Sequence, residues 1–230
     1  MERWLILETS GRCGQVALAT GPRIWATRTL DAARRHARDL APAVGALLQE
    51  QGWRPRDLIG VIVSRGPGSY TGLRVGIMSA KAFAYATGAV LIAVDTFDAV
   101  AAQSPPDVPL LDIIGDAQQD KVYLQQFARQ PANSNAQAVS PLTIVPFHEW
   151  LTERDASAWV SGPGLHRLHP RLPPECQVAD SQLWDPTAQA LLQIGLARHA
   201  RGEHDDPYAL EPLYLRPSSA EEQWTRRHTP

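Results

Sequence analysis

Short apolar runs separated by turn residues open the chain. Residues 4–8, 15–19 and 24–29 each have the length and the Val, Ile, Leu or Thr content of a strand, and Gly and polar residues lie between them. Gly-rich and Gly-Pro breaks of this kind mark tight turns. The opening segment therefore predicts three strands in succession, and the first of them ends in the carboxylate Glu8.

The hydrophobic period changes to that of a helix over residues 39–51. One face of this helix carries Leu40, Val44, Leu47 and Leu48. Gly52 follows as a stop signal, and Pro42 is tolerable if it lies in the first turn, where its missing N–H is not needed.

A strand, a tight loop and a second helix come next. Residues 58–64 form an apolar run, Gly66-Pro67-Gly68-Ser69 interrupts any periodicity, and a helical pattern continues to Thr87, before Gly88. We name the interrupting segment, residues 66–69, the glycine loop.

The helix after the glycine loop is apolar nearly all round. Its apolar stripes are Leu73, Ile77, Ala80 and Ala84, and Val75, Met78 and Ala82. Arg74 and Lys81 are its clearest charges, and Gly72, Gly76 and Ala80 form a smooth track that another backbone can approach. Such a helix is either a central core helix or a partner-binding helix, and the pattern alone favours neither.

The second half of the chain echoes the first. After the Pro-rich segment 104–109, an apolar strand at 110–115 ends at Asp116, and a polar turn leads to a returning strand at 122–127. Glu8 occupies the same place before its own returning strand. The repeat predicts a duplicated α/β architecture with two similar cores.

Weaker signals fill the remainder of the chain. We expect an exposed loop at 129–139, strands at 142–145, 158–161 and 177–179, and helices at 97–103, 147–154 and 187–201. Residues 208–216 predict an extended strap. The domains expected are 1–104 and 105–216, with the last helix and tail able to pack back on the first, followed by a frayed tail at 217–230.

Composition excludes several classes of protein. The 230 residues carry a net charge of −2 with 44% hydrophobic and 20% charged residues, so the chain is unlike an autonomous nucleic-acid binder. Cys13 and Cys176 are far apart, and neither a signal peptide nor a membrane-length apolar run is visible. A reduced, cytoplasmic protein is expected.

Candidate chemistry is sparse. The glycine loop matches neither a P-loop nor G-x-G-x-x-G. The pairs His166 with His169 and His199 with His204 lack a nearby Cys or carboxylate at metal-ligand spacing, so no metal site is predicted. Glu8 and Asp116 end equivalent strands, where two-lobed nucleotide-binding folds place acids, although carboxylates that satisfy turn N–H groups are the preferred interpretation.

Several motifs together resemble the bacterial TsaB (YeaZ) family. The stretch G-P-G-S-Y-T-G-L-R-V-G from Gly66 to Gly76 is highly specific. The supporting motifs, in order, are Leu5-Ile6-Leu7-Glu8-Thr9-Ser10, His36 with Leu40-Ala41-Pro42, Asp116-Ala117 before Val122-Tyr123, and Pro212-Leu213-Tyr214-Leu215-Arg216.

The resemblance implies an actin-like (ASKHA) two-lobed fold and a role in making threonylcarbamoyladenosine beside the tRNA anticodon. It implies a noncatalytic subunit with no cofactor of its own, because ATP and metal belong to its partners, a TsaD-like transferase and a TsaE-like ATPase. The transferase holds its metal with an H-x-x-x-H pair, where this chain has Thr96 and Val100. Glu8 stands where an Asp is usual, which displaces any bound phosphate or metal. The resemblance therefore implies at most a vestigial phosphate or metal site, formed by Glu8, Ser10 and Asp116.

We therefore expect pairing with the transferase, and self-association as a dimer when alone, with tRNA reached only through the complex. The expected interface residues are Leu40, Val44, Leu47, Leu48, Gly72, Leu73, Arg74, Gly76, Ile77, Ala80 and Lys81. A bulky residue at Gly76 is then expected to abolish pairing and leave the fold largely intact. The main rival is a standalone ATP-dependent small-molecule kinase that uses Glu8 and Asp116; a peptidase is the weaker third alternative.

Overall fold

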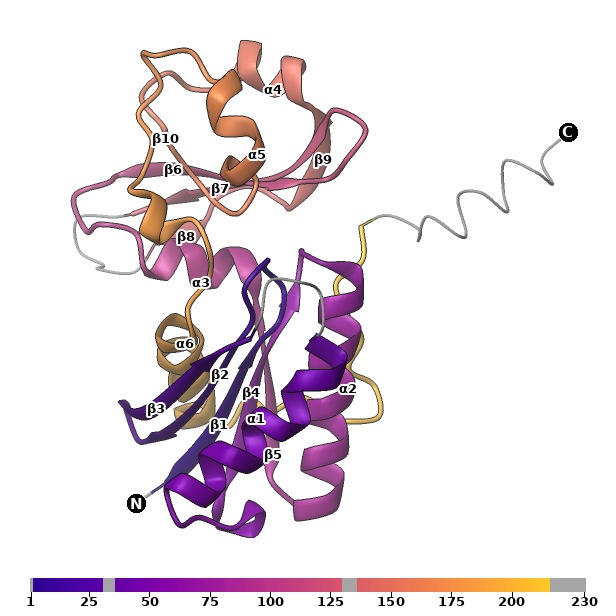
Figure 1. Cartoon of the computed structure of the whole chain (residues 1–230). Coiled ribbons are helices and arrows are strands. Elements are labelled where there is room, and N and C mark those ends of the chain that lie inside the picture. Colours follow the sequence, from indigo (N-terminus) through magenta and orange to yellow (C-terminus); the bar gives the residue numbers. More distant parts are fainter. Residues whose placement is uncertain (1, 31–35, 130–135, 216–230) are drawn as a thin grey trace, which may run out of the picture.

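The computed structural model describes residues 2–30, 36–129 and 136–215. Two lobes are stacked one above the other, each built on a mixed β-sheet (Figure 1). Predictions made for residues 217–230, and for most of the loop at 129–139, concern residues outside the described ranges.

The first sheet has the strand order β3-β2-β1-β4-β5. Its strands are β1 (Arg3–Glu8), β2 (Gln15–Thr20), β3 (Arg23–Thr29), β4 (Gly60–Gly66) and β5 (Val90–Asp95). β1, β2 and β3 pair antiparallel in succession, as the turn signals predict, while β1, β4 and β5 pair in parallel. The central strands β1 and β4 are almost entirely buried, because helices cover both faces of the sheet.

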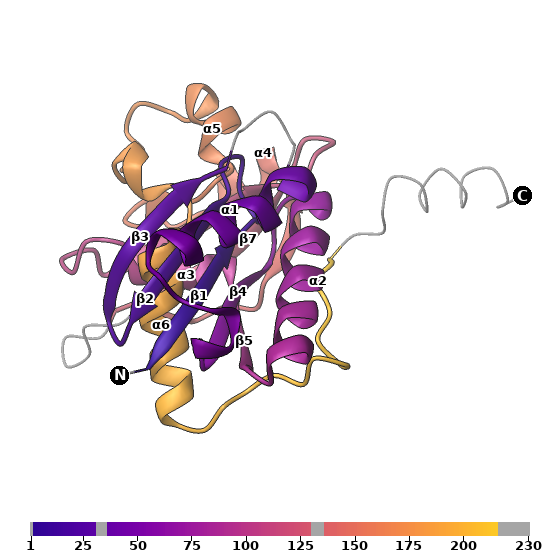
Figure 2. The same ribbon diagram turned by 60° about the horizontal axis from the view of Figure 1, so that its bottom comes forward.

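Two long helices cover one face of this sheet and a third covers the other. α1 (His36–Glu50) and α2 (Tyr70–Thr87) lie on the same face, and α6 (Ala188–Ala200) lies on the opposite face (Figure 2). α1 starts earlier than the sequence predicts, at His36, so Pro42 lies inside the helix and not in its first turn.

The second sheet repeats the first. β6 (Leu110–Asp116) pairs antiparallel with β7 (Lys121–Ala128) and parallel with β10 (Trp159–Ser161), as β1 does with β2 and β4. The short strands β8 (Gln137–Ala138) and β9 (Thr143–Pro146) both pair with β7 and together take the place of β3. The predicted duplicated, actin-like α/β fold is therefore confirmed.

Short helices complete the second lobe. α4 (Phe147–Glu153) and α5 (Leu165–Leu168) pack on one face of its sheet, around Ile114 and Val122. Three single 3-10 turns, η1 (Pro55–Asp57), η2 (His169–Arg171) and η3 (Ser181–Leu183), lie between the longer elements. The sequence did not predict α5, and residues 177–179 form a single bridge between Val160 and Val178 instead of a strand.

One short helix lies between the lobes. α3 (Thr96–Ala102) contacts β4, β5 and α6 of the first lobe and β6 of the second. Phe97, Val100 and Ala101 enter one apolar cluster with Leu111 and Phe127. The two lobes are therefore joined by shared hydrophobic packing.

The chain returns to the first lobe at its C-terminal end. α6 packs on Trp4, Ile6 and Ile62, and the segment after it runs past the edge of β5, where Asp205 bridges Leu91. Residues 206–215, which we name the strap, then follow α2 (Figure 1). In the part of the chain that the structure describes, none of the helices has the length and apolar content needed to span a bilayer.

Candidate functional site: a closed turn and an open helix face

The glycine loop connects β4 to α2, as the sequence predicts. Ser69 caps the helix, because its side chain accepts a hydrogen bond from the N–H of Gly72 at 3.2 Å. At the other end Gly88 has φ 78° and donates its N–H to the carbonyl of Ala84. These two caps mark the start and the end of an 18-residue helix.

The smooth track on α2 faces the protein's own backbone. A Cβ added at Gly72 would lie 2.0 Å from the carbonyl oxygen of Thr9, and one added at Gly76 would lie 2.1 Å from Thr9 Oγ1. The close approach predicted from these glycines is real, but its partner is the turn after β1. A bulky residue at Gly76 therefore cannot leave the fold intact, and that expectation was wrong.

Most of the predicted interface residues are core residues. Eight of them are buried by their own chain: Leu40, Leu47, Leu48, Gly72, Leu73, Gly76, Ile77 and Ala80. The larger side chains of α1 and the residues Ile77 and Ala80 of α2 share one apolar cluster with β1, β2 and β4, because the apolar stripe used for the prediction is the one that faces the sheet. Only Val44, Arg74 and Lys81 of the predicted set reach the surface.

The surface of α2 carries a second, different apolar set. Met78 is 62% exposed and Tyr85 75% exposed, and Thr71, Arg74 and Ala82 complete an exposed stripe along the helix. On α1, the helix that contacts α2, Ala41 and Gly45 are exposed small residues. We name this surface, formed by Ala41, Gly45, Thr71, Arg74, Met78, Ala82 and Tyr85, the outer face of α2.

The strap borders the outer face with aromatic rings. Tyr214 stacks on Tyr70 with ring centroids 4.6 Å apart, and Arg74 lies over Tyr70 and donates a hydrogen bond to the Tyr214 hydroxyl. Lys81 is held by a bond from its Nζ to the carbonyl of Leu210. Arg74 and Lys81 are thus engaged with the strap of their own chain.

The turn after β1 is closed around the Glu8 carboxylate. Glu8 Oε1 accepts hydrogen bonds from the N–H and hydroxyl of Ser10, both at 2.6 Å, and from the N–H of Gly11 at 3.2 Å. Backbone N–H groups in such turns are the donors that bind phosphate in other proteins. Here the protein's own carboxylate occupies them, as the turn interpretation of Glu8 predicts.

Burial sets the protonation of this carboxyl. Glu8 is 1% exposed, and desolvation raises its pKa from 4.5 to about 7, while its hydrogen bonds with Ser10, the nearby Ser64 hydroxyl and Gly11 act in the opposite direction. Glu8 Oε2 is buried with no partner that satisfies hydrogen-bond geometry. Burial therefore favours the protonated form of the Glu8 carboxyl more than solvent does.

A second carboxylate covers the same turn. A Cβ added at Gly11 would lie 3.5 Å from Asp185 Oδ1, and Asp185 Oδ2 lies 2.6 Å from His166 Nε2 of the second lobe. Gln103 fixes this segment through bonds to the carbonyls of Leu183 and Asp185. The acidic lining disfavours a phosphate beside Gly11.

Asp116 also has partners other than Glu8. It accepts a hydrogen bond from the N–H of Gln118 and pairs with Arg167 at 2.9 Å. No hydrogen bond or ion pair joins it to Glu8, although both residues are described. The sequence places the two carboxylates at equivalent strand ends correctly, but the structure gives each its own partners.

Thr96 and Val100, which the resemblance compares with a metal-binding histidine pair, lie on α3. Thr96 and Val100 are both 0% exposed, and Val100 belongs to the apolar cluster between the lobes. Within residues 2–30, 36–129 and 136–215, no group of three or more His, Cys, Asp or Glu side chains has the arrangement of a metal site.

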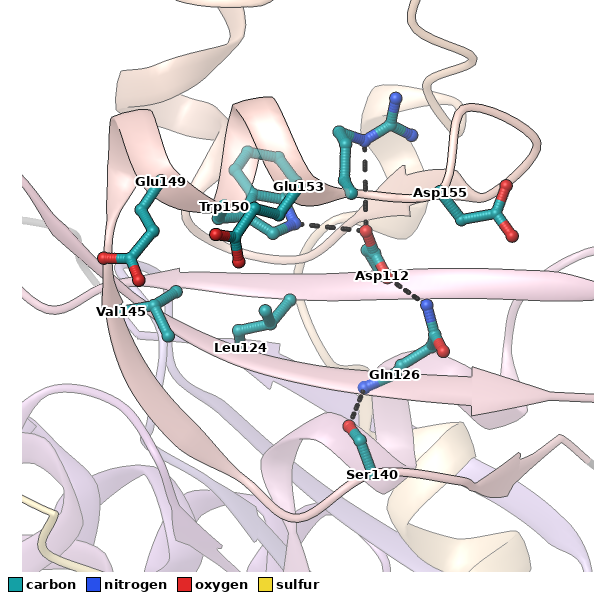
Figure 3. A pocket seen from close by; sticks show the side chains of 10 residues that line it. Asp112, Leu124, Gln126, Ser140, Val145, Glu149, Trp150, Glu153 and Asp155 are labelled. Atoms are coloured by element: carbon teal, nitrogen blue, oxygen red, sulfur yellow. Dashed lines mark hydrogen bonds and ion pairs between the residues drawn. The ribbon is translucent and has the colours of Figure 1, made fainter.

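A cavity of about 270 Å³ lies elsewhere, between α4 and the second sheet (Figure 3). The buried Asp112 at its base accepts hydrogen bonds from Trp150 Nε1 and Gln126 Nε2 and lies 3.9 Å from Arg154 Nε. Glu149, Glu153 and Asp155 make its wall acidic. Asp112 ties α4 to the sheet, and the cavity contains none of the predicted site residues.

Comparison with known proteins identifies the class first. A family model described as "TsaD: tRNA N6-adenosine threonylcarbamoyltransferase" matches residues 30–144. The TsaB protein of Bacillus subtilis (strain 168) is 28% identical over 96% of both chains. That of Escherichia coli (strain K12) is 26% identical over 93% of this chain and 94% of its own. The solved structure of YeaZ from Pseudomonas aeruginosa superimposes with a TM-score of 0.77 at 26% identity, covering 94% of this chain and all of the other.

The match to the family model spans half of the chain, and the similarity to the two TsaB proteins runs through nearly its whole length. The chain therefore belongs to the threonylcarbamoyltransferase-like family that this model describes and, within it, to the TsaB (YeaZ) group.

Sequence reasoning missed Met78, Tyr85 and the strap residue Tyr208 as surface residues. All three are large, unbranched or aromatic side chains next to smaller apolar ones, and Tyr208 and Tyr85 contact each other with centroids 6.4 Å apart. The usable signal was size, since small and branched residues fit against a sheet whereas Met and Tyr are common on binding surfaces.

Proposed function

We propose that the chain is a noncatalytic subunit of the system that makes threonylcarbamoyladenosine in tRNA. The observation that carries the noncatalytic role is the closed turn after β1, in which Glu8 accepts the hydrogen bonds that a phosphate would need. Similarity to two TsaB proteins over almost their full length supports the pathway. Thr96 and Val100 offer no imidazole to a metal.

The chain acts, in this proposal, by pairing with a TsaD-like transferase through the outer face of α2. This face combines exposed Met78 and Tyr85 with small residues on α1 and α2, which allow a helix of the partner to approach. Four of the seven exposed large hydrophobic side chains in the described ranges belong to α2 or the strap: Met78, Tyr85, Tyr208 and Tyr214.

The same face serves for self-association when the transferase is absent. A TsaE-like ATPase joins the pair, tRNA is reached through the complex, and the site of action is the cytoplasm. The chain contributes no nucleotide or metal to the chemistry, so calorimetric titration of the isolated chain with Mg-ATP is expected to show feeble binding and no turnover.

Reconstitution tests the noncatalytic role. Transferase, ATPase, tRNA and this chain are combined, and threonylcarbamoyladenosine is quantified in the tRNA. We expect the yield to fall when the chain is omitted and to be restored by an E8Q/D116N double variant, because neither carboxylate takes part in the chemistry. An E8Q/D116N variant that binds the transferase normally but restores no activity would contradict the proposal and favour the kinase-like alternative.

A further inference from the structure

Four arginines gather at the end of the first lobe opposite the second lobe. This end is formed by the start of β1, the turn between β2 and β3, and the segment after α1 (Figure 1). The strand register pairs Arg3 with Thr20, and Thr20 with Arg23. Arg3 and Arg23 therefore lie in one row on the same face of the sheet, about 10 Å apart. Arg54 and Arg56 come from η1 and the residue before it.

Two tryptophans lie among these arginines. The guanidinium carbon of Arg23 is 3.9 Å from the centroid of the Trp25 ring, and that of Arg3 is 4.7 Å from the centroid of Trp53. Trp25 is 47% exposed. A half-exposed ring that an arginine holds in place offers a surface on which another flat group can stack. We name this surface, formed by Arg3, Arg23, Trp25, Trp53, Arg54 and Arg56, the basic patch.

The basic patch is positive although the whole chain carries a net charge of −2. Its four arginines have one carboxylate among them, Asp57, which lies 3.5 Å from Arg3 and 3.8 Å from Arg54. The Arg54 side chain is 87% exposed, and Arg23 and Arg56 form no ion pair with any residue that the structure describes. Positive charge therefore remains available to an anionic partner.

The other nearby carboxylates leave this excess in place. Glu2 lies 3.7 Å from His199 of α6, on the opposite face of the sheet. Glu50, at the end of α1, pairs with Arg28 of β3, so these two charges cancel. An anion that approaches the basic patch therefore meets mainly arginines.

Arginines beside an exposed tryptophan suit a nucleic-acid strand better than an acidic peptide. The guanidinium fork binds phosphate oxygens, and an aromatic ring stacks on unpaired bases. An acidic peptide would use the charges and leave the exposed Trp25 ring without a flat partner.

We propose that the basic patch binds a single-stranded stretch of RNA, with the arginines on its phosphates and an unpaired base on Trp25. That the strand is RNA rests on the proposed function, because the same chemistry fits any single strand. None of the residues of the basic patch belongs to the outer face of α2. RNA and the transferase can therefore be bound at the same time.

The number of charges limits the strength of this contact. Four arginines can neutralise only a few phosphates, so the isolated chain should bind RNA with a Kd of about 1–100 μM, weakening as salt is added. The basic patch therefore adds to the hold of the whole complex on tRNA and does not replace it.

The test measures binding of a fluorescein-labelled tRNA transcript to the tag-free, full-length chain by fluorescence anisotropy over a series of salt concentrations. R23Q/R56Q removes two exposed charges and keeps the side-chain length. We expect the affinity to fall by about tenfold, and the slope of log affinity against log salt to become shallower by about 0.7 for each arginine. W25A should weaken binding by about fivefold or more and leave the slope unchanged, because it removes stacking and no charge.

R167Q/R171Q makes the same change in net charge on the second lobe, at two exposed arginines, and should bind tRNA as the wild type does. Every variant should melt at the wild-type temperature. Absence of binding by the wild type, wild-type affinity in R23Q/R56Q or in W25A, or an equal loss in R167Q/R171Q would each overturn the proposal. Displacement of the tRNA by polyglutamate at equal charge would also overturn it and assign the basic patch to an acidic protein.

The assay contains no transferase, so its result does not depend on pairing through α2. A chain that stimulates the transferase in the reconstitution but binds no tRNA would overturn the basic patch alone. A chain that binds tRNA through the basic patch but has no effect in the reconstitution would contradict the proposed function alone.

Discussion

The two faces of α2 both carry apolar side chains, yet one face packs inside its own lobe and the other is exposed to solvent. The inner face presents Gly72, Gly76 and Ile77 to the turn after β1 and to the sheet, with no room to spare. The outer face presents Arg74, Met78 and Tyr85 to solvent. Side-chain size distinguishes them more clearly than hydrophobicity does.

The difference shows how one helix meets two demands. Glycines allow α2 to approach Thr9 closely, which fixes the helix on its own lobe. Flexible Met and broad Tyr side chains on the other side gain by being covered. Changes on the inner face should therefore cost stability, and changes on the outer face should cost pairing.

The largest effect is expected for G76L. The added side chain begins 2.1 Å from Thr9 Oγ1, so the helix and the turn after β1 cannot both keep their positions. We expect little or no cooperatively folded protein by circular dichroism melting. A G76L chain that melts at the wild-type temperature would show that α2 does not need this close contact.

A smaller loss is expected for I77A. Ile77 is 1% exposed among β-strand side chains of the first lobe, and truncation to Ala leaves a cavity. The free energy of unfolding should fall by about 2–5 kcal/mol in urea titrations. The adjacent M78A is the matched control, and because its side chain is 62% exposed it should change stability by about 0.5 kcal/mol or less.

The turn after β1, against which the inner face of α2 packs, predicts that the stability of the protein depends on pH. The pKa of Glu8 is raised to about 7 in the folded protein, so the fold holds this proton more tightly than the unfolded chain does. Its contribution to stability is complete below about pH 4.5 and is lost as the pH rises through about 7.

E8Q keeps the shape of this side chain but removes its titration. Stability should then fall less steeply between pH 4.5 and 7 in urea titrations at several pH values. D98N is the control for the remaining slope, because burial and the neighbouring Asp95 raise the pKa of Asp98 to about 6. If stability falls with pH as steeply in E8Q as in the wild type, Glu8 does not cause this pH dependence.

The smallest effect is expected at the edge of the outer face. R74A removes a cation–π contact with Tyr70 and a hydrogen bond to Tyr214, both at the surface. The free energy of unfolding should fall by about 0.5–1 kcal/mol. Limited proteolysis near the strap should increase at the same time; a loss as large as that of I77A would mean that the strap is part of the core.

The sequence was sufficient for most of the fold. The apolar runs, the glycine loop and the echo between Glu8 and Asp116 lead to the duplicated lobes, because each signal acts locally through turn geometry or hydrophobic period. α5 was missed because it is only four residues long and Gly-Pro-Gly precedes it. Pro42 was misplaced because helix starts are weakly encoded.

The candidate site was harder to predict, and for a physical reason. A helix covered on one side by its own lobe and left open on the other has two apolar stripes, and the period does not say which stripe meets the sheet. The partners of Glu8 and Asp116 were equally hidden, since Asp185 and Arg167 lie far away in sequence and meet these turns only through the fold.

The affinity of this chain for a TsaD-like transferase, the partner proposed above, tests the outer face most directly when it is measured by calorimetry for M78E. Glu at this exposed position should leave the melting temperature unchanged and weaken pairing by at least about 2 kcal/mol, because it would place a charge at the centre of an apolar contact. V139E, a matched change at a 56% exposed apolar residue of the second lobe, should pair as the wild type does. If M78E binds the transferase as tightly as the wild type, α2 does not dock through its outer face.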